Sequence, residues 1–252
     1  MPNLHPIYLL TTIVKYGKKT ATGFFFSDEG VLYLVTNKHV IYNSSYSQPS
    51  PVPKIDSLTL TLHSNREDLS VNEDVQISLF DADKKRLWLE HSAPEIDVIL
   101  IPVSIDEQKF VISKMDRSFI DNTDNLLVQF EKILVVGYPF GWYDDKFNLP
   151  IVRVGHLSSP FKMSFKGSPV MVGDAITHPG MSGSPVMMLL KDPLSRDERG
   201  KLSVKHGNKY ILAGVYSAQF EVFGKVRRHL INIWFPEVIE WILKENASLK
   251  KT

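Results

Sequence analysis

The chain has 252 residues, of which 43% are hydrophobic and 23% are charged, and its formal net charge at pH 7 is +1. This composition is typical of a globular protein with a buried core, and so small a charge gives no reason to expect binding to nucleic acid or to an anionic membrane. The absence of cysteine excludes disulfides and thiolate metal sites and favours a reducing compartment, so we expect a cytoplasmic protein.

The first apolar stretch, residues 7–14, has no basic residue before it and no small-residue cleavage site after it. We interpret it as the first strand of the fold rather than as a signal peptide. No apolar stretch in the chain approaches the roughly 18 residues that a membrane span requires. A membrane partner is therefore not expected.

Short apolar segments separated by turn residues recur along the chain, most of them about 4 to 8 residues long and rich in Val, Ile, Leu, Phe and Thr. They cover residues 7–14, 22–26, 31–36, 58–63, 75–79, 98–103, 133–136, 151–154, 186–190, 210–217 and 227–233. This pattern predicts an all-β sandwich or barrel. Within it, TGFFF-SDEG-VLYLVT predicts a hairpin whose four-residue turn ends in Gly30.

Three polar stretches are expected to be loops, at residues 42–54, 116–125 and 191–208. We expect the second to link two halves, and the third, which is highly charged, to form a long exposed hairpin. A helix is predicted only at the C-terminus, in FPEVIEWILKENA. Helical spacing there places four large apolar side chains on one face, after a proline in the first turn. These side chains are Val238, Ile239, Trp241 and Ile242.

The stretch PGMSGSPV, residues 179–186, places a serine between two glycines directly before an apolar run. A serine hydroxyl is a poor nucleophile at neutral pH, so it needs a base, a group that orients the base, and donors for the oxyanion. Ser182 is the candidate nucleophile, because Gly180 allows a turn and exposes an N–H while Gly183 permits close approach of a substrate. Ser184 is the rival nucleophile.

Two further residues fit the roles that such a serine requires. His39 ends the segment YLVTNKHV, directly after a predicted strand, and is the candidate base. Asp97 leads into an apolar run in PEIDVILIPV, where an unpaired buried carboxylate is costly and calls for a partner such as an imidazole N–H. Taken alone, each residue also has an interpretation without a catalytic role. His39 would then be a structural histidine beside a strand, and Asp97 a solvated residue at the start of a strand.

Taken together and in this order, TNKHV, IDVILI and GMSGSP resemble the chymotrypsin-type serine protease superfamily. Within that superfamily, the chain is most similar to bacterial trypsin-like peptidases of the high-temperature-requirement type. GDAITHPGMSGSPV, TATGFFF, VVGYPFG and AGVYSAQF each resemble a segment of that group, and the likeness extends over residues 7–245.

The resemblance implies two six-stranded antiparallel barrels packed at right angles, followed by a C-terminal helix. Residues 1–115 would form the first barrel, 116–125 the linker, 126–235 the second barrel, and 236–252 the helix and tail. His39 and Asp97 would lie on the first barrel and Ser182 on the second.

The resemblance also implies the chemistry: a serine endopeptidase that forms an acyl-enzyme and uses no metal or cofactor. His39 would be the general base, Asp97 the orienting carboxylate and Ser182 the nucleophile. The oxyanion hole would consist of the backbone N–H groups of Gly180 and Ser182, with Met181 between them. The expected partner is a polypeptide substrate.

In this family the base of the specificity pocket lies six residues before the nucleophile, which here is Ile176. The other expected substrate-binding residues are Thr177, His178, Tyr216, Ser217, Ala218 and Gln219. An apolar base disfavours cleavage after Lys or Arg and favours a small or apolar residue before the cut. An alternative is that His178 reaches the pocket and recognises a polar side chain.

Two alternatives remain open at this stage. One is a catalytically silent protease-like fold that binds a peptide or partner, and the other is a two-barrel viral capsid or processing protease. Met181 replaces the acidic residue that receives the new N-terminus in secreted relatives, so activation by N-terminal trimming is not expected. We hypothesise instead that a partner protein or ligand controls activity, as in a bacterial stress or antiviral-defence effector.

Overall fold

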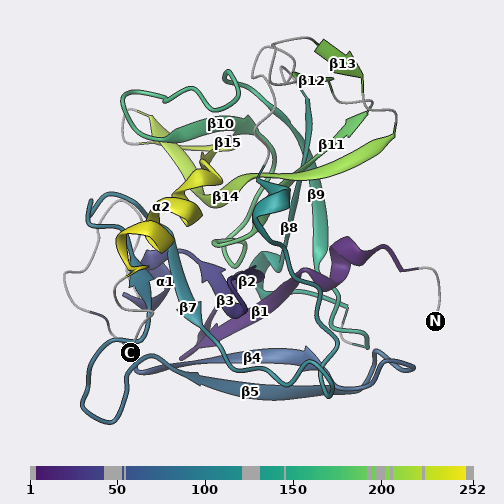
Figure 1. The fold of residues 1–252 in the computed structure, drawn as a ribbon, viewed down its shortest axis with the longest axis vertical. Coiled ribbons are helices and arrows are strands. Elements are labelled where there is room, and N and C mark those ends of the chain that lie inside the picture. The colour runs from purple at the N-terminus through teal and green to yellow at the C-terminus, as the bar shows by residue number, and fades with distance from the viewer. Residues whose placement is uncertain are drawn as a thin grey trace.

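The structure is a computed structural model that describes residues 4–42, 53, 55–120, 131–144, 146–191, 194–196, 202–204, 207–222 and 225–247. In this part of the chain, two antiparallel β arrangements follow one another (Figure 1). The N-terminal one, in purple to blue, contains β1 to β7. The C-terminal one, in teal to yellow, contains β8 to β15 and leads into the helix α2.

The N-terminal arrangement is a seven-stranded sheet with the strand order β5-β4-β1-β2-β3-β7-β6. Its strands are β1 (Thr11–Tyr16), β2 (Lys19–Asp28), β3 (Val31–Thr36), β4 (Ser57–His63), β5 (Asn72–Ser78), β6 (Leu89–Glu90) and β7 (Ile99–Pro102). The 3-10 helix η1 (Pro6–Leu9) precedes β1, and the short helix α1 (Lys38–Ile41) follows β3.

The C-terminal arrangement is a closed barrel in which the strand order is β10-β15-β14-β11-β8-β9. These strands are β8 (Lys132–Gly137), β9 (Ile151–Leu157), β10 (Val170–Asp174), β11 (Pro185–Lys191), β14 (Asn208–Val222) and β15 (Lys225–Trp234). Strands β12 (Leu194–Arg196) and β13 (Leu202–Val204) form a separate two-stranded sheet. Two short 3-10 helices are η2 (Arg117–Phe119), before β8, and η4 (Pro139–Gly141), between β8 and β9.

The predicted all-β, chymotrypsin-like fold with a C-terminal helix is confirmed, but the N-terminal half is a seven-stranded sheet and not the predicted closed six-stranded barrel. The N-terminal sheet has a seventh strand, because the short β6 pairs with β7 through Leu89 and Glu90. In the predicted linker, Arg117–Phe119 forms η2, while residues 121–125 lie outside the described residues. In the predicted loop at 42–54, all but residues 42 and 53 lie outside the described residues, and so does half of 191–208. The described part of 191–208 contains β12 and β13, which pair antiparallel within the predicted hairpin.

The predicted hairpin is formed by β2 and β3, with a tighter turn than expected. Asp28 pairs with Val31, so the turn consists of Glu29 and Gly30 alone. Both residues have positive φ, 49° and 82°, as a two-residue turn of the primed type requires. The hairpin fixes β3, and with it the start of α1.

Strand β2 is buried on both faces, which explains its continuous apolar run. Phe25 packs in the core of the N-terminal sheet with Leu34 and neighbouring side chains. Phe24 and Phe26 point the other way, into a larger core that contains Val135 and other residues of the barrel. Because this second core includes side chains from both β arrangements, it fixes their positions relative to each other.

Helix α2 (Glu237–Glu245) forms where it was predicted, and three of the four apolar residues expected on one face are buried. Val238, Ile239 and Ile242 are buried as expected, together with Leu243. Trp241, which the helical spacing places on the same face, is 38% exposed. None of the described helices is both long enough and apolar enough to cross a bilayer.

Candidate active site

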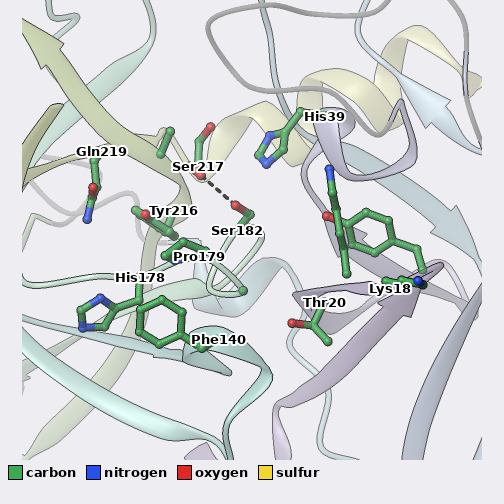
Figure 2. A pocket seen from close by; sticks show the side chains of 14 residues that line it. Lys18, Thr20, His39, Phe140, His178, Pro179, Ser182, Tyr216, Ser217 and Gln219 are labelled. Carbon is green, nitrogen blue, oxygen red and sulfur yellow. Dashed lines mark hydrogen bonds between the residues drawn. The ribbon is translucent and has the colours of Figure 1, made fainter. Parts of the chain in front are cut away.

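Residues from both β arrangements line a cleft with a volume of about 540 Å³ (Figure 2). Most of the predicted site residues line it: His39, His178, Gly180, Ser182, Tyr216, Ser217, Ala218 and Gln219. The chain folding thus brings the candidate base and the candidate nucleophile to one cavity, although they are 143 positions apart in the sequence.

His39 reaches the cleft from α1, which starts directly after β3 ends. Its ring Nδ1 lies 2.7 Å from Asp97 Oδ2, and its backbone N–H donates to Asp97 Oδ1 at 2.8 Å. A carboxylate can only accept, so Nδ1 carries the proton of the neutral ring. Nε2 is then left with a free lone pair, as a general base requires.

Asp97 is 6% exposed and accepts further hydrogen bonds from outside α1. Ser217, on β14, donates its hydroxyl to Asp97 Oδ2 at 2.6 Å. The Asn37 side-chain amide donates to the Asp97 backbone carbonyl at 2.7 Å. These bonds offset the cost of burying the carboxylate and hold it in one orientation. Ser217, predicted as a pocket wall, therefore also contacts the candidate triad.

Ser182 lies in a turn that the two flanking glycines make possible. Gly180 has φ +95°, and a Cβ there would lie 2.4 Å from the Tyr138 carbonyl oxygen. Gly183 has φ +86°, and a Cβ there would lie 2.2 Å from the Thr22 carbonyl oxygen. Both positions thus exclude a side chain, for reasons of conformation and of space. The turn is held against β2, because the Thr22 N–H donates to the Ser182 carbonyl at 2.9 Å.

The Ser182 hydroxyl donates to the backbone carbonyl of Ser217 at 3.2 Å, the contact drawn as a dashed line in Figure 2. In the same view, the His39 imidazole lies above Ser182 at the edge of the cleft. The hydroxyl proton therefore points toward β14 in this conformation. A rotation of the Ser182 side chain is needed before the proton can pass to His39.

The candidate oxyanion donors differ in what they contact. Met181 N–H donates to the His178 carbonyl at 3.2 Å, and the Met181 side chain is fully buried in the core. The Pro179 carbonyl accepts a hydrogen bond from the Phe140 N–H. Since a trans peptide holds its C=O and N–H in opposite directions, the Gly180 N–H points away from Phe140. In the described part of the chain, neither Gly180 N–H nor Ser182 N–H donates to another residue.

On the other side of the cleft, hydrogen bonds connect β14 to the segment before the nucleophile. Thr177 donates its hydroxyl to the Tyr216 hydroxyl at 3.0 Å, and the Gln219 side-chain amide donates to the Thr177 carbonyl at 2.7 Å. Burial raises the pKa of Tyr216 to about 12, so its hydroxyl keeps its proton at neutral pH. His178 stacks on Phe140, with ring centroids 4.7 Å apart.

The structure does not bring Ile176 to the cleft. Its side chain is 43% exposed, whereas Ala175 and Thr177 on either side are 3% and 1% exposed. Side chains alternate between the two faces of an extended segment, so the inward positions here belong to the neighbours of Ile176. Of these, Thr177 contacts the cleft residues Tyr216 and Gln219.

Several residues of the cleft were not identified from the sequence, among them Tyr16, Lys18, Lys19, Thr20 and Phe140. They lie on the β1–β2 hairpin and on η4, away from the motifs around His39 and Ser182. Phe140 has the unusual φ of 57° directly before Gly141, and the YPFG turn was the one available signal for it. Among the described residues, no group of three or more His, Asp or Glu side chains is arranged to hold a metal ion.

Comparisons with known proteins bear on the family and the fold of the chain. The family model of the trypsin-like peptidase domain matches residues 21–189, which is more than half of the chain. A search of the curated proteins found no match. Among solved structures, the HtrA-type protease AlgW with a tripeptide has a TM-score of 0.52 and 16% identity, over 95% of this chain and 60% of that one. The present chain thus spans about 60% of the length of AlgW.

A second solved structure, the inactive form of the Rv3671c protease of M. tuberculosis, has a TM-score of 0.51 and 14% identity. The match covers 95% of this chain and 89% of Rv3671c. At these identities the two structures support the chymotrypsin-like fold, and the family-model match identifies the family. The chain belongs to the trypsin-like peptidase family.

Proposed function

We propose that this protein is a serine endopeptidase in which Ser182 is the nucleophile, His39 the general base and Asp97 the carboxylate that orients His39. The observation that supports this proposal most directly is the pair of hydrogen bonds from His39 to the two oxygens of Asp97, at 2.8 and 2.7 Å. They fix both the tautomer and the position of an imidazole that lines the same cleft as Ser182.

In the proposed reaction, the Ser182 hydroxyl rotates from the Ser217 carbonyl toward His39. His39 Nε2 takes the proton as Ser182 Oγ bonds to the carbonyl carbon of the scissile peptide. The carbonyl oxygen becomes an oxyanion that accepts from the N–H groups of Gly180 and Ser182. The protonated His39 then gives its proton to the leaving amine, the C–N bond breaks, and water hydrolyses the acyl-enzyme by the same steps.

Asp97 contributes by orientation and charge. It keeps the proton on His39 Nδ1 and stabilises the imidazolium that forms during the reaction. Ser217 acts as a positioning residue, because its hydroxyl donates to the same carboxylate oxygen at 2.6 Å. Met181 is not a donor in this scheme, since its N–H donates to the His178 carbonyl.

The proposal includes a preference for a small or apolar residue before the cleaved bond. The Gln219 side chain crosses from β14 to the Thr177 carbonyl and limits the depth available to a substrate side chain. None of the described residues that line the cleft is Asp or Glu, so a buried Lys or Arg side chain would find no carboxylate there. With Ile176 outside the cleft, the preference rests on Gln219 and Tyr216 instead.

We also propose that a partner protein or ligand controls the activity. In support, the Ser182 hydroxyl donates to the Ser217 carbonyl, so a bound partner that favours the other rotamer would raise turnover. If the purified chain cleaves generic substrates at full rate without any addition, this part of the proposal is wrong. The cytoplasmic location expected from the cysteine-free sequence remains a prediction.

Cleavage of casein and of a peptide library, followed by mass spectrometry, tests the proposed activity. The wild type is expected to cleave, and Ser182→Ala is expected to lose at least about a thousandfold of the rate. Ser184→Ala is the matched control, because Ser184 is fully buried and its hydroxyl has no partner among the described residues. If neither the wild type nor the control cleaves any peptide, the alternative of a silent, peptide-binding fold is favoured.

A further inference from the structure

One side of the cleft carries positive charge that the proposed reaction does not use. The described residues lining the cleft include two lysines, Lys18 and Lys19, and no Asp or Glu. Both lysine side chains are exposed, and Lys18 makes no ion pair with any described residue. A cleft with charges of one sign attracts the opposite charge and discriminates against its own sign.

The lysines and the pocket residues lie on opposite sides of the candidate nucleophile. Figure 2 shows Tyr216, Ser217 and Gln219 on one side of Ser182, and Lys18 and Thr20 on the other. A peptide bond cleaved at Ser182 must have its acyl half on one of these sides and its leaving half on the other.

Strand β14 is the side suited to the acyl half. Its pairing with β11 ends at Val215, and its register with β15 shifts between Tyr216 and Gln219. The backbone at Ser217 and Ala218 can therefore pair with an extended substrate, as peptides commonly add to the edge of a sheet. The leaving half then extends past Thr20 toward Lys18.

The position of Lys18 is defined by the structure around it. Gly17 and Lys18 form a two-residue turn, with Gly17 at φ 56° and with Tyr16 paired to Lys19. The hairpin is in close contact with η4, since a Cβ on Gly141 would lie 2.8 Å from Thr20 Oγ1. The two lysines therefore lie on a paired hairpin that lines one side of the cleft.

Resting on the function proposed above, we propose that Lys18 and Lys19 select substrates with a carboxylate in the leaving half, within roughly three residues after the scissile bond. Either an Asp or Glu side chain or the C-terminal carboxylate of a short leaving fragment supplies this chemistry. Because the amines are exposed, the preference is modest and depends on salt.

A matched peptide series tests the proposal. The acyl half is kept constant, and the second and third residues after the scissile bond are Glu, Gln or Lys. At about 0.02 M salt, kcat/KM is expected to be about two- to tenfold higher for Glu than for Lys, and the difference should nearly vanish at about 1 M. Lys18→Glu combined with Lys19→Glu is expected to reverse the order. A pair of peptides ending in a free acid or an amide distinguishes the two sources of the carboxylate.

The control is Lys84→Glu combined with Lys85→Glu, which makes the same change in net charge. Lys84 and Lys85 are exposed between β5 and β6 and do not line the cleft, so the preference should be unchanged. The same peptides are also titrated against Ser182→Ala by fluorescence anisotropy. Equal binding of the Glu and Lys peptides, or a preference that persists in the Lys18/Lys19 variant, would overturn the inference. If the Glu peptides bind more tightly than the Lys peptides but the wild type cleaves neither, the charge preference is supported and only the proposed function is refuted.

Discussion

The Thr22 hydroxyl donates to the Gly180 carbonyl at 2.9 Å and accepts from the Tyr138 N–H at 3.1 Å. Thr22 lies on β2 in the N-terminal sheet, whereas Gly180 and Tyr138 belong to the C-terminal half. One buried side chain therefore connects the two halves directly behind the candidate oxyanion donors. This contact makes the position of Gly180 depend on the docking of the two halves.

Thr22→Val tests that connection, because valine keeps the shape and removes both hydrogen bonds. The Gly180 carbonyl and the Tyr138 N–H would each lose a partner, at about 1–3 kcal/mol per buried group. We expect a lower free energy of unfolding in urea together with a lower kcat. Thr22→Ser, which keeps the hydroxyl, should preserve most of both. Equal stability and kcat in all three proteins would show that the connection is unimportant.

We expect substitutions at Asp97 and at Ser217 to lower kcat by different amounts. Asp97→Asn presents an N–H toward His39 Nδ1 and favours the wrong tautomer, so kcat should fall by about 10⁴-fold with little change in KM. Ser217→Ala removes one donor and leaves the two from His39, so a smaller loss is expected. Steady-state kinetics on one peptide would measure both. A Ser217→Ala loss as large as that of Asp97→Asn would contradict the assignment of Ser217 as a positioning residue only.

We expect Gln219 to limit the size of the substrate side chain that the pocket accepts before the scissile bond. Gln219→Ala removes the side chain that donates to the Thr177 carbonyl across the cleft. Peptides with Leu or Phe before the scissile bond should gain about tenfold in kcat/KM relative to those with Ala. Gln108→Ala, at an exposed position outside the cleft, is the control. An unchanged size preference would mean that other residues limit the pocket.

We expect the buried His63 to make the free energy of unfolding depend on pH. It is 6% exposed and its ring Nδ1 lies 3.0 Å from the Leu69 carbonyl, and burial lowers its pKa from 6.5 because the charged ring is poorly solvated. The unfolded chain therefore binds a proton at a higher pH than the folded chain does. His63 makes its full contribution to the free energy of unfolding above pH 6.5. That contribution is lost as the pH falls from 6.5 toward the lowered pKa of His63, by at most about 1.4 kcal/mol per pH unit.

Urea unfolding of the wild type and of His63→Gln, between pH 7.5 and about 5, measures this contribution. The variant should be less stable at neutral pH, where it loses the fit of the imidazole, and should lose less stability on acidification. His156→Gln, at an exposed position, should follow the wild type. Parallel pH curves for all three proteins would rule out a contribution from His63.

The strands and the local motifs were predictable because their signals are short-range. The hairpin of β2 and β3 follows from its turn and its apolar runs. The pairing of His39 with Asp97, 58 positions apart, was expected only from the resemblance to serine proteases, and the two side chains lie 2.7 Å apart. The contacts Thr22–Gly180 and Ser217–Asp97 were not predictable, because they join residues 158 and 120 positions apart and depend on how the halves dock.

The expectation for Ile176 failed, and the exposure of Trp241 did not follow from the sequence, for reasons of geometry. Ile176 was assigned by counting from Ser182, but in an extended segment a difference of one residue moves a side chain to the opposite face. Trp241 fits the helical period, yet its ring is 38% exposed beside His91, with centroids 6.2 Å apart. The helical period gives the direction of a side chain only to within part of a turn. Whether that side chain is buried depends on the surface that packs against the helix.

Covalent labelling with a fluorophosphonate probe, followed by mass spectrometry of the digested protein, determines whether Ser182 is the nucleophile. We expect one adduct per chain, on Ser182, in the wild type and in Ser184→Ala, and none in Ser182→Ala. An adduct that persists in Ser182→Ala, or a wild-type protein that hydrolyses peptides but is never labelled at Ser182, would contradict this assignment.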